Sequence, residues 1–430
     1  MAKAAGPNAS AGPSLVAIAA IQVIEELYPR KRQRDSIVAQ YRQALDLLPP
    51  VTLVRRDSKA VLVDGYHRLL AFRLENRPEI PAEFVDCNDI LLEAIRRNAA
   101  HGYQLEDADK GRCARTLYIR AENPIRDETE LGAILGVSGR AIRGYLADIK
   151  RQEKDARNTR IRELWLDCYS QEEIAEVVGL SLDRLTHALP AILEDLPKQQ
   201  VPSSLQTWTL WEEWSECDER YGSDYPGRMP GQVVENLLHY LTEPGDCVLD
   251  PMAGSGTTRD VCQAMGRRCY AADCNPLPGK SYLRHLAIDA AGNLPEVPGT
   301  VKRAGGFQLI LLDPPYWQQA DYGDAPENLG AIADFDDYAD TVAAILAHSL
   351  ATVKPSGYVA IISSSTMRDR QVYQPMSIWC HHALALGATL WDWVIVPYTS
   401  ERAAGFHVSD AQRAKRLLRR HRDLAIFQRA

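Results

Sequence analysis

A chain of 430 residues, 46% of them hydrophobic and 25% charged, is long enough for two or three domains and has the composition of an ordinary globular protein. Its net charge of −8 excludes a basic surface over the whole molecule, so contacts with nucleic acid require local patches. The nine cysteines include no Cys-x-x-Cys pair, which argues against a zinc site or a disulfide framework and favours a reduced, cytoplasmic protein. No apolar run is long enough to cross a membrane, and the run at 15–24 lacks the basic flank of a signal peptide.

The beginning of the chain is predicted to form a disordered tail and then a small α+β domain. Residues 1–14 are mainly Ala, Gly, Pro, Asn and Ser, which bury too little apolar surface to fold. In the domain predicted at 15–120, a helix with apolar residues at helical spacing spans 37–48. Short apolar strands follow at 51–54 and 60–63, and the second one leads directly into a glycine turn.

This glycine turn carries a basic residue at the start of the next helix, a combination that suits phosphate binding. The region resembles the ParB/sulfiredoxin-like N-terminal domain, whose Gly-x-x-Arg-x-x-Ala core matches Gly65, Arg68 and Ala71. The resemblance implies that a nucleoside triphosphate binds through Gly65, His67, Arg68 and Asn98. The family's second motif has an acid directly before the asparagine. In this chain Arg97 replaces that acid, so metal-assisted hydrolysis of the nucleotide is not implied. Nucleotide binding and a structural or DNA-docking role both remain open.

Residues 121–195 are predicted to form two helix-turn-helix units in tandem. Each unit has a helix, a glycine turn at Gly136 or Gly179, and a serine N-cap at Ser138 or Ser181 before the second helix. The second helix of such a unit enters the major groove of DNA. The residues expected to contact DNA there are Arg140, Arg143 and Arg184, with His187 in a similar position. A plain helical connector with the same turn chemistry is the alternative.

A linker is predicted at 196–207, where two prolines and two serines interrupt the helical pattern. The last domain then spans 208–430. It begins with three tryptophans at a spacing of three residues, for which core packing is favoured over base stacking. They are Trp208, Trp211 and Trp214.

The first motif of this domain is a strand, a Gly-rich turn and a helix at 246–258. Small residues let the backbone approach a ligand closely, and the helix N-terminus offers free N–H groups. The next strand, 268–272, ends at Asp273, where a carboxylate is placed to bind ribose hydroxyls. A dinucleotide site is the competing interpretation, but the full Gly-x-Gly-x-x-Gly pattern is absent.

The second motif follows an apolar strand predicted at 307–312. The chain continues with Asp313-Pro314-Pro315-Tyr316, and it must leave the sheet because proline has no N–H to donate. In an open parallel sheet, ligands bind at the carboxyl ends of the strands. An acid, free carbonyls and an aromatic face at this place suit a flat base with an exocyclic amino group. An ordinary Pro-Pro turn after a strand is the alternative.

Together the two motifs resemble the amino-methyltransferases that use S-adenosylmethionine, over roughly residues 221–430. The second motif is similar to the catalytic motif of adenine-N6 and cytosine-N4 DNA methyltransferases and of some RNA guanine-N2 enzymes. The resemblance implies a Rossmann-like sheet and methyl transfer without a metal. The implied catalytic residues are Asp313, Pro314, Pro315 and Tyr316. The implied cofactor-binding residues are Asp250, Pro251, Met252, Ala253, Gly254, Ser255, Gly256, Thr257, Thr258 and Asp273.

Within this family, adenine N6 in DNA is the favoured target, because an acid at the first motif position is commoner in the adenine enzymes. Cytosine-N4 methylation, RNA guanine-N2 methylation and a DNA-binding regulator with an inactive methyltransferase half remain open. The predicted fold class is α/β, with a small α+β domain and an all-helical region before the Rossmann-like sheet.

The end of the chain is predicted to complete the sheet. Apolar strands lie at 391–397 and 424–427, and the resemblance implies an antiparallel pair that closes a seven-stranded sheet. The segment 409–422 between them is the most basic stretch of the chain, and DNA phosphate contact is favoured there over a solvated helix. The expected contacts are Arg413, Arg416, Arg419 and Arg420. Because no segment is long enough for a separate target-recognition domain, target selection is expected to come from the N-terminal half or to be weak.

Overall fold

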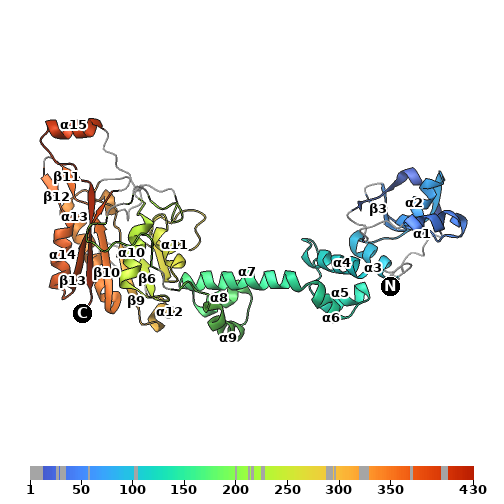
Figure 1. The fold of residues 1–430 in the computed structure, drawn as a ribbon, viewed down its shortest axis with the longest axis horizontal. Coiled ribbons are helices and arrows are strands. Elements are labelled where there is room, and N and C mark those ends of the chain that lie inside the picture. Colours follow the sequence, from blue (N-terminus) through green and yellow to red (C-terminus); the bar gives the residue numbers. More distant parts are fainter. Residues whose placement is uncertain are drawn as a thin grey trace, which may run out of the picture. The chain divides into compact units, whose positions relative to one another are not determined.

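The chain forms two compact units, Met1–Asp155 and Ala156–Ala430, and the division falls inside helix α7 (Ala147–Leu166) of the computed structural model (Figure 1). Residues 1–12, which make up most of the predicted tail, lie outside the described residues. No helix in the described part of the chain is long and apolar enough to cross a membrane. The residues that the structure describes are 13–25, 29, 35–56, 59–100, 105–198, 201–211, 214, 217–223, 228–286, 294, 297–318, 329–368, 371–398 and 405–430.

The first unit opens with a five-stranded mixed sheet in the order β1-β5-β3-β4-β2. Strands β3 and β4 are antiparallel, as their short connection requires, and β3 is parallel to β5. Helices α1 and α2 pack on the sheet through an apolar core that includes Leu53, Leu69 and Phe72. The elements are β1 (Ser14–Ala17), β2 (Ile21–Gln22), α1 (Asp35–Arg42), β3 (Val51–Arg56), β4 (Lys59–Asp64), α2 (Tyr66–Leu74), β5 (Glu79–Phe84) and α3 (Ile90–Ala100).

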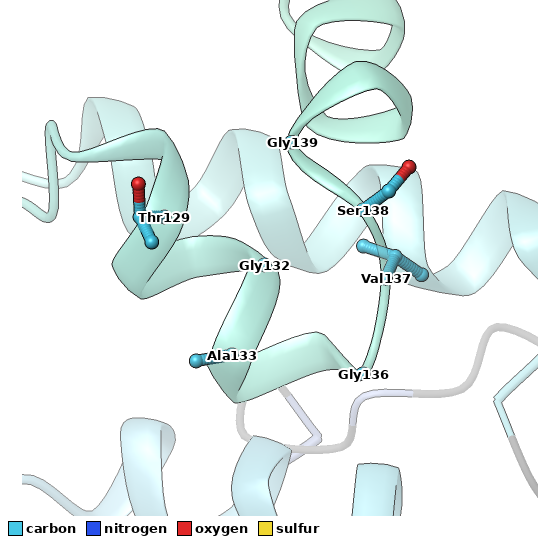
Figure 2. Close-up of a pocket in the computed structure, with 7 residues that line it drawn as sticks. All are labelled: Thr129, Gly132, Ala133, Gly136, Val137, Ser138 and Gly139. Atoms are coloured by element: carbon cyan, nitrogen blue, oxygen red, sulfur yellow. The ribbon is translucent and has the colours of Figure 1, made fainter.

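The predicted first helix pair is present as α5 (Glu128–Leu135) and α6 (Gly139–Tyr145), packed against α4 (Asp107–Ile119). Gly136 adopts φ +62° and ends α5, and the Ser138 hydroxyl accepts the Ala141 N–H at 3.3 Å to cap α6 (Figure 2). A side chain at Gly132 would come within 2.8 Å of the Val137 carbonyl oxygen. The turn between the two helices therefore passes too close to α5 for a larger side chain at Gly132.

The second helix pair, α8 (Gln171–Val178) and α9 (Leu182–Leu193), belongs to the second unit. Ser170 and Glu173 form a reciprocal capping box at the start of α8, with hydrogen bonds of 3.1 and 2.7 Å. Ser181 lies at the N-cap position of α9, as predicted, but its side chain makes no capping hydrogen bond there. An apolar core that includes Ile161 and Leu185 joins the pair to the end of α7.

The second unit is built on a seven-stranded sheet in the order β13-β14-β10-β9-β6-β7-β8. The strands from β10 to β8 run parallel, and β14 is antiparallel to both β10 and β13. The predicted antiparallel pair that closes a seven-stranded sheet is thus confirmed. The strands are β6 (Cys247–Asp250), β7 (Arg268–Asp273), β8 (Arg284–His285), β9 (Phe307–Leu312), β10 (Val353–Ser363), β13 (Thr389–Pro397) and β14 (His421–Gln428).

Helices cover both faces of this sheet, because its strands alternate apolar side chains between two cores. Helices α13 (Phe335–Thr352) and α14 (Pro375–Ala385) pack on the face that carries Ile310 and Leu312, while α10 (Gly231–Leu241) and α11 (Thr257–Ala264) pack on the face that carries Leu309 and Leu311 (Figure 1). The remaining elements are α12 (Gly299–Arg303), β11 (Thr366–Arg368), β12 (Gln371–Tyr373) and α15 (Gly405–Arg413).

The three tryptophans at 208, 211 and 214 do not lie on one helix face. Only some of them pack in the core as predicted. The segment around Leu210 is extended and bonds to the edge strand β13, where the Trp211 N–H donates to the Ile395 carbonyl at 2.9 Å. Trp211 is consequently buried, whereas Trp208 is 75% exposed. A helical spacing in the sequence carries no information about burial where the backbone is extended.

Candidate active site

Three acids gather at one edge of the seven-stranded sheet. Asp250 and Asp273 are the last residues of β6 and β7, and Asp313 directly follows β9. Because β6 lies between β9 and β7, the three carboxylates come from adjacent parallel strands. The pKa of Asp250 is raised to about 7, chiefly by burial and also by the charges of Asp313 and Asp273. The structure therefore brings together the acids of both sequence motifs.

The Gly-rich loop after β6 is tied to the end of β7. The Asp273 carboxylate accepts the Gly254 N–H at 2.8 Å with one oxygen and the Asn275 N–H at 2.8 Å with the other. Gly256 adopts φ +82° at the start of α11, and a side chain there would come within 2.7 Å of the Tyr282 hydroxyl oxygen. These contacts hold the free N–H groups of the first turn of α11 next to Asp273.

The second motif leaves the sheet at Asp313 and is fixed by helix α13 and the loop before it. The Tyr338 hydroxyl donates to the Pro315 carbonyl at 3.1 Å, and the Trp317 indole N–H donates to the Ile332 carbonyl at 2.9 Å. Burial raises the pKa of Asp313 to about 6, against the positive charge of Arg422 and a hydrogen bond from the Tyr316 hydroxyl. Burial also raises the pKa of Tyr316 well above its ordinary value. Both side chains are half-buried at this edge of the sheet.

Arg422 is a residue of this site that the sequence analysis counted only among the basic residues of its segment. It lies on β14 and is 4% exposed. Its guanidinium lies 5.2 Å from the centroid of the Tyr398 ring, and its positive charge lowers the pKa of Asp313. Its place in the alternation of β14, two residues before Leu424, is the signal that could have identified it as an inward-facing residue.

The basic segment before β14 is not a single helix. Helix α15 ends at Arg413, and Lys415 has φ +49°, which breaks the helical path. Arg416 forms an ion pair of 2.7 Å with Asp410 and is exposed, as are Arg413 and Arg420. Arg419 is half-buried. Most of the expected phosphate contacts therefore face solvent.

The four expected nucleotide-binding residues lie around the start of α2. Gly65 has φ +102°, and a side chain there would come within 2.7 Å of Val51. Gly65 and Asn98 line one small cavity, and Arg68 pairs with Asp64 at 2.9 Å. The Arg68 Nε atom is buried with no hydrogen-bond partner among the described residues, and His67 is half-buried. Arg97, which replaces the family's acid, pairs with Glu93 and Glu83.

The expected DNA-reading arginines are exposed in both helix pairs. Arg140 and Arg143 lie on α6, and Arg143 forms a 3.2 Å ion pair with Glu128 that leaves its side chain 63% exposed. Arg184 and His187 are exposed on α9. The two arginine sets belong to different compact units.

The second helix pair is bound to the helix of the Gly-rich loop by a contact that the sequence analysis missed. Asp167, which follows α7, accepts two hydrogen bonds from Arg259 of α11 at 2.8 and 2.9 Å and one from Gln263 at 3.1 Å. Asp167 is 3% exposed, and Arg284 donates to its carbonyl at 2.9 Å. Helices α8 and α9 are therefore an integral part of the unit that carries the three acids.

Comparisons with known proteins find similarity over part of the chain. Residues 145–277 match the model of the DNA methylase family, for N6 and N4 methyltransferases. The match includes Asp250 and Asp273 and ends before Asp313. Within the described residues, no cluster of three or more His, Cys, Asp or Glu side chains is arranged to hold a metal ion.

Individual relatives are similar over short stretches. The type II methyltransferase M2.DpnII of Streptococcus pneumoniae is 35% identical over 66 residues, 15% of this chain and 23% of that protein. The DNA adenine methyltransferase YhdJ of Escherichia coli (strain K12) is 32% identical over 83 residues, 19% of this chain and 28% of that protein. The chain thus spans about a quarter of the length of these curated relatives.

A solved structure of the C-terminally truncated chromosome-partitioning protein ParB from Caulobacter crescentus, complexed to the centromeric parS site, is similar at 15% sequence identity. The similarity covers 43% of this chain and 93% of that chain, with a TM-score of 0.26.

Proposed function

We propose that this protein is a DNA methyltransferase that transfers a methyl group from S-adenosylmethionine to the exocyclic amine of a flipped base, adenine N6. The observation that carries the proposal is the edge of the seven-stranded sheet. There the Gly-rich loop, Asp273 and the Asp313–Tyr316 motif follow three adjacent strands. The family match over residues 145–277 supports DNA as the substrate.

The residues around the Gly-rich loop fit this cofactor. Each oxygen of Asp273 accepts one backbone N–H and keeps a second lone-pair site for a ribose hydroxyl. Asp250 and Asp313 add negative charge close by, which favours a cationic sulfonium. When bound, S-adenosylmethionine supplies an electrophilic methyl group.

The chain's own contribution is to present the amine. The lone pair of an exocyclic amine is delocalised into the base, so the nitrogen is a poor nucleophile. Asp313 and the carbonyl of Pro314 accept both amino hydrogens, which favours a pyramidal nitrogen whose lone pair points at the methyl group. Tyr316 stacks on the base, which must leave the duplex to reach this place.

The test is transfer of a labelled methyl group to DNA and to RNA by the full chain, with Asp313→Ala beside the wild type. Asp313→Ala is expected to abolish labelling of DNA while calorimetry still detects cofactor binding, because Asp313 follows a different strand from Asp250 and Asp273. Labelling of RNA but not DNA would favour the guanine-N2 alternative. Retained activity within a few-fold in the variant would contradict the role of Asp313, and a wild type that binds cofactor but labels nothing would favour the inactive regulator.

We infer a second binding function for the first unit, a nucleoside triphosphate at Gly65, His67, Arg68 and Asn98. It is supported by the buried Arg68 Nε atom without a described partner beside the Gly65 turn. Arg97 occupies the position of the family's acid, so the expected binding does not depend on a divalent metal. Titration of CTP and ATP into the wild type and into Arg68→Ala, with and without Mg²⁺, tests this. Equal heats for the two proteins would rule the site out.

A further inference from the structure

Strand β14 delivers a buried arginine to the edge of the sheet where the three acids lie. Because β14 is antiparallel to β10, it begins at the edge where the parallel strands end, and Asp423 lies opposite Ser363, the last residue of β10. Arg422 therefore lies at the edge of the sheet where the three acids lie.

The alternation of side chains places Arg422 on the same face as Asp313. Leu309 and Leu311 of β9 share one apolar core with Leu424 and Ile426 of β14. Asp313 lies two residues after Leu311, and Arg422 lies two residues before Leu424. Side chains two residues apart in extended backbone point to the same face, so both charged residues continue this apolar face toward the same edge. Two apolar rows thus end in opposite charges on one face of the sheet.

Arg422 is too deeply buried to be a phosphate contact of the basic segment. It is 4% exposed, and its Nε atom has no hydrogen-bond partner in the described part of the chain. A charged side chain in such a place needs compensating partners. Those partners are the hydroxyl of Tyr316, the carboxylate of Asp313 and the ring of Tyr398.

The chemistry of these groups fixes the direction of the hydrogen bonds. A guanidinium has donors only, so the Tyr316 oxygen accepts the hydrogen bond from Arg422. The Tyr316 hydroxyl hydrogen is then left to donate toward Asp313, and the Tyr316 hydroxyl lowers the pKa of Asp313. The three residues form a directed chain from guanidinium to hydroxyl to carboxylate.

We propose that Arg422 is a positioning residue of the active site, which orients the Tyr316 hydroxyl toward Asp313 and keeps Asp313 in its ionised, hydrogen-accepting form. This inference rests on the proposed methyl transfer. Asp313 accepts an amino hydrogen only with an oxygen that carries no proton. Arg422 acts through the other two residues and needs no contact with the base.

The pH dependence of the reaction follows from the groups around Asp313. Burial raises the pKa of Asp313 to about 6, while Arg422 and Tyr316 oppose this shift. Asp250, on the neighbouring strand, interacts with Asp313 and carries a like charge when ionised. The reaction rate is therefore expected to fall as the pH drops through about 6. Without Arg422 the pKa of Asp313 rises, and the acid limb of the pH–rate profile moves to higher pH.

The test uses the full chain, labelled S-adenosylmethionine at saturation, and genomic DNA from cells that lack the protein, assayed from pH 5 to pH 9. Arg422→Met is expected to move the acid limb up by about 1–3 pH units, the usual effect of a lost opposite charge at short range. Arg422→Lys keeps the charge and is expected to return the limb toward its wild-type position. Arg429→Met is the control, because Arg429 donates to the Ala351 carbonyl at the opposite end of β14.

Tyr316→Phe supplies a second, independent measurement, since it removes the hydroxyl and keeps the ring. It is expected to raise the acid limb with Arg422 intact, and the combined variant with Arg422→Met should shift the limb by less than the sum of the single shifts. An acid limb that stays in place in Tyr316→Phe overturns the proposal even where Arg422→Met does not fold. A wild type that labels no DNA refutes the proposed function instead, which separates the two failures.

Discussion

At the scale of single residues, the three acids at the sheet edge have different surroundings and therefore different tasks. Asp250 is buried and its pKa is raised to about 7, so its carboxyl group loses its proton only near neutral pH. Asp273 accepts one backbone N–H with each carboxylate oxygen, which leaves one lone-pair site on each. Asp313 has Arg422 and Tyr316 as partners and is kept ready to accept a hydrogen. Under the proposed function, these environments assign cofactor binding to Asp273 and chemistry to Asp313.

The proposed cofactor-binding role of Asp273 has a direct consequence. Asp273→Ala removes paired, charge-assisted hydrogen bonds and is expected to weaken binding of S-adenosylmethionine by roughly 1.5–3 kcal/mol. Calorimetry measures this change. Asp246→Ala is the matched control, because Asp246 precedes β6 at the opposite end from Asp250 and pairs with Lys354. Unchanged affinity in Asp273→Ala, or equal losses in both variants, would refute the assignment.

At the scale of elements, helices α8 and α9 are anchored to α11 by a buried ion pair rather than connected by a loose linker. The Arg259 side chain is 15% exposed and that of Asp167 is 4% exposed, so the pair is shielded from water and from salt. Burial raises the pKa of Asp167, against the hydrogen bonds from Arg259 and Gln263. Because the Gly-rich loop leads into the start of α11, the helix pair and this loop are both attached to α11.

Removal of this anchor is expected to destabilise the protein strongly. Asp167→Ala leaves the Arg259 charge buried without its partner, and breaking a buried pair in this way costs about 3–5 kcal/mol. Asp195→Ala is the control, since Asp195 pairs with Arg162 at 3.4 Å while 78% exposed, and a change below about 0.5 kcal/mol is expected. Denaturant unfolding of both variants measures the difference. Similar stabilities for the two would contradict the anchoring role of Asp167.

At the scale of the whole molecule, the division inside α7 separates the two helix pairs. The unit Ala156–Ala430 contains α9 with Arg184, the basic segment and the candidate active site. The other unit contains α6 with Arg143 and the Gly65 turn. Phosphate contacts carry no sequence information, whereas side chains delivered into a groove read base edges. Target selection therefore depends on which of these helices enter the groove.

A fragment comprising Ala156–Ala430 is expected to bind cofactor and to methylate DNA with less site preference than the full chain. Arg143→Ala in the full chain should lower discrimination between sites by about 1–3 kcal/mol if Arg143 reads a base. The control is removal of charge at Arg416 and Arg413, which should weaken binding evenly across sequences and flatten its salt dependence. Sequencing of the methylated sites measures the first two, and DNA-binding titrations at several salt concentrations measure the third. Identical site preference in fragment and full chain would place recognition within the second unit.

The sequence by itself determined those helices, strands and turns whose backbone conformation depends on residues close by in the chain. Glycines at 254 and 256 and the prolines after Asp313 dictate backbone conformations within a few residues, so strand, turn and helix could be predicted around both motifs. The glycine turns and serine caps of the two helix pairs were predictable for the same reason. The seven-stranded sheet followed from resemblance rather than from the residues alone.

Only the tertiary structure decided which distant residues meet. The pairing of Asp167 with Arg259 joins positions 92 residues apart, and no local pattern in either segment indicates it. Arg422 looks like one more cation of a basic stretch, and only the antiparallel course of β14 turns it toward Asp313 and removes it from water. Strand order and direction set these contacts, because burial depends on what packs against a side chain and not on the residues beside it in the chain.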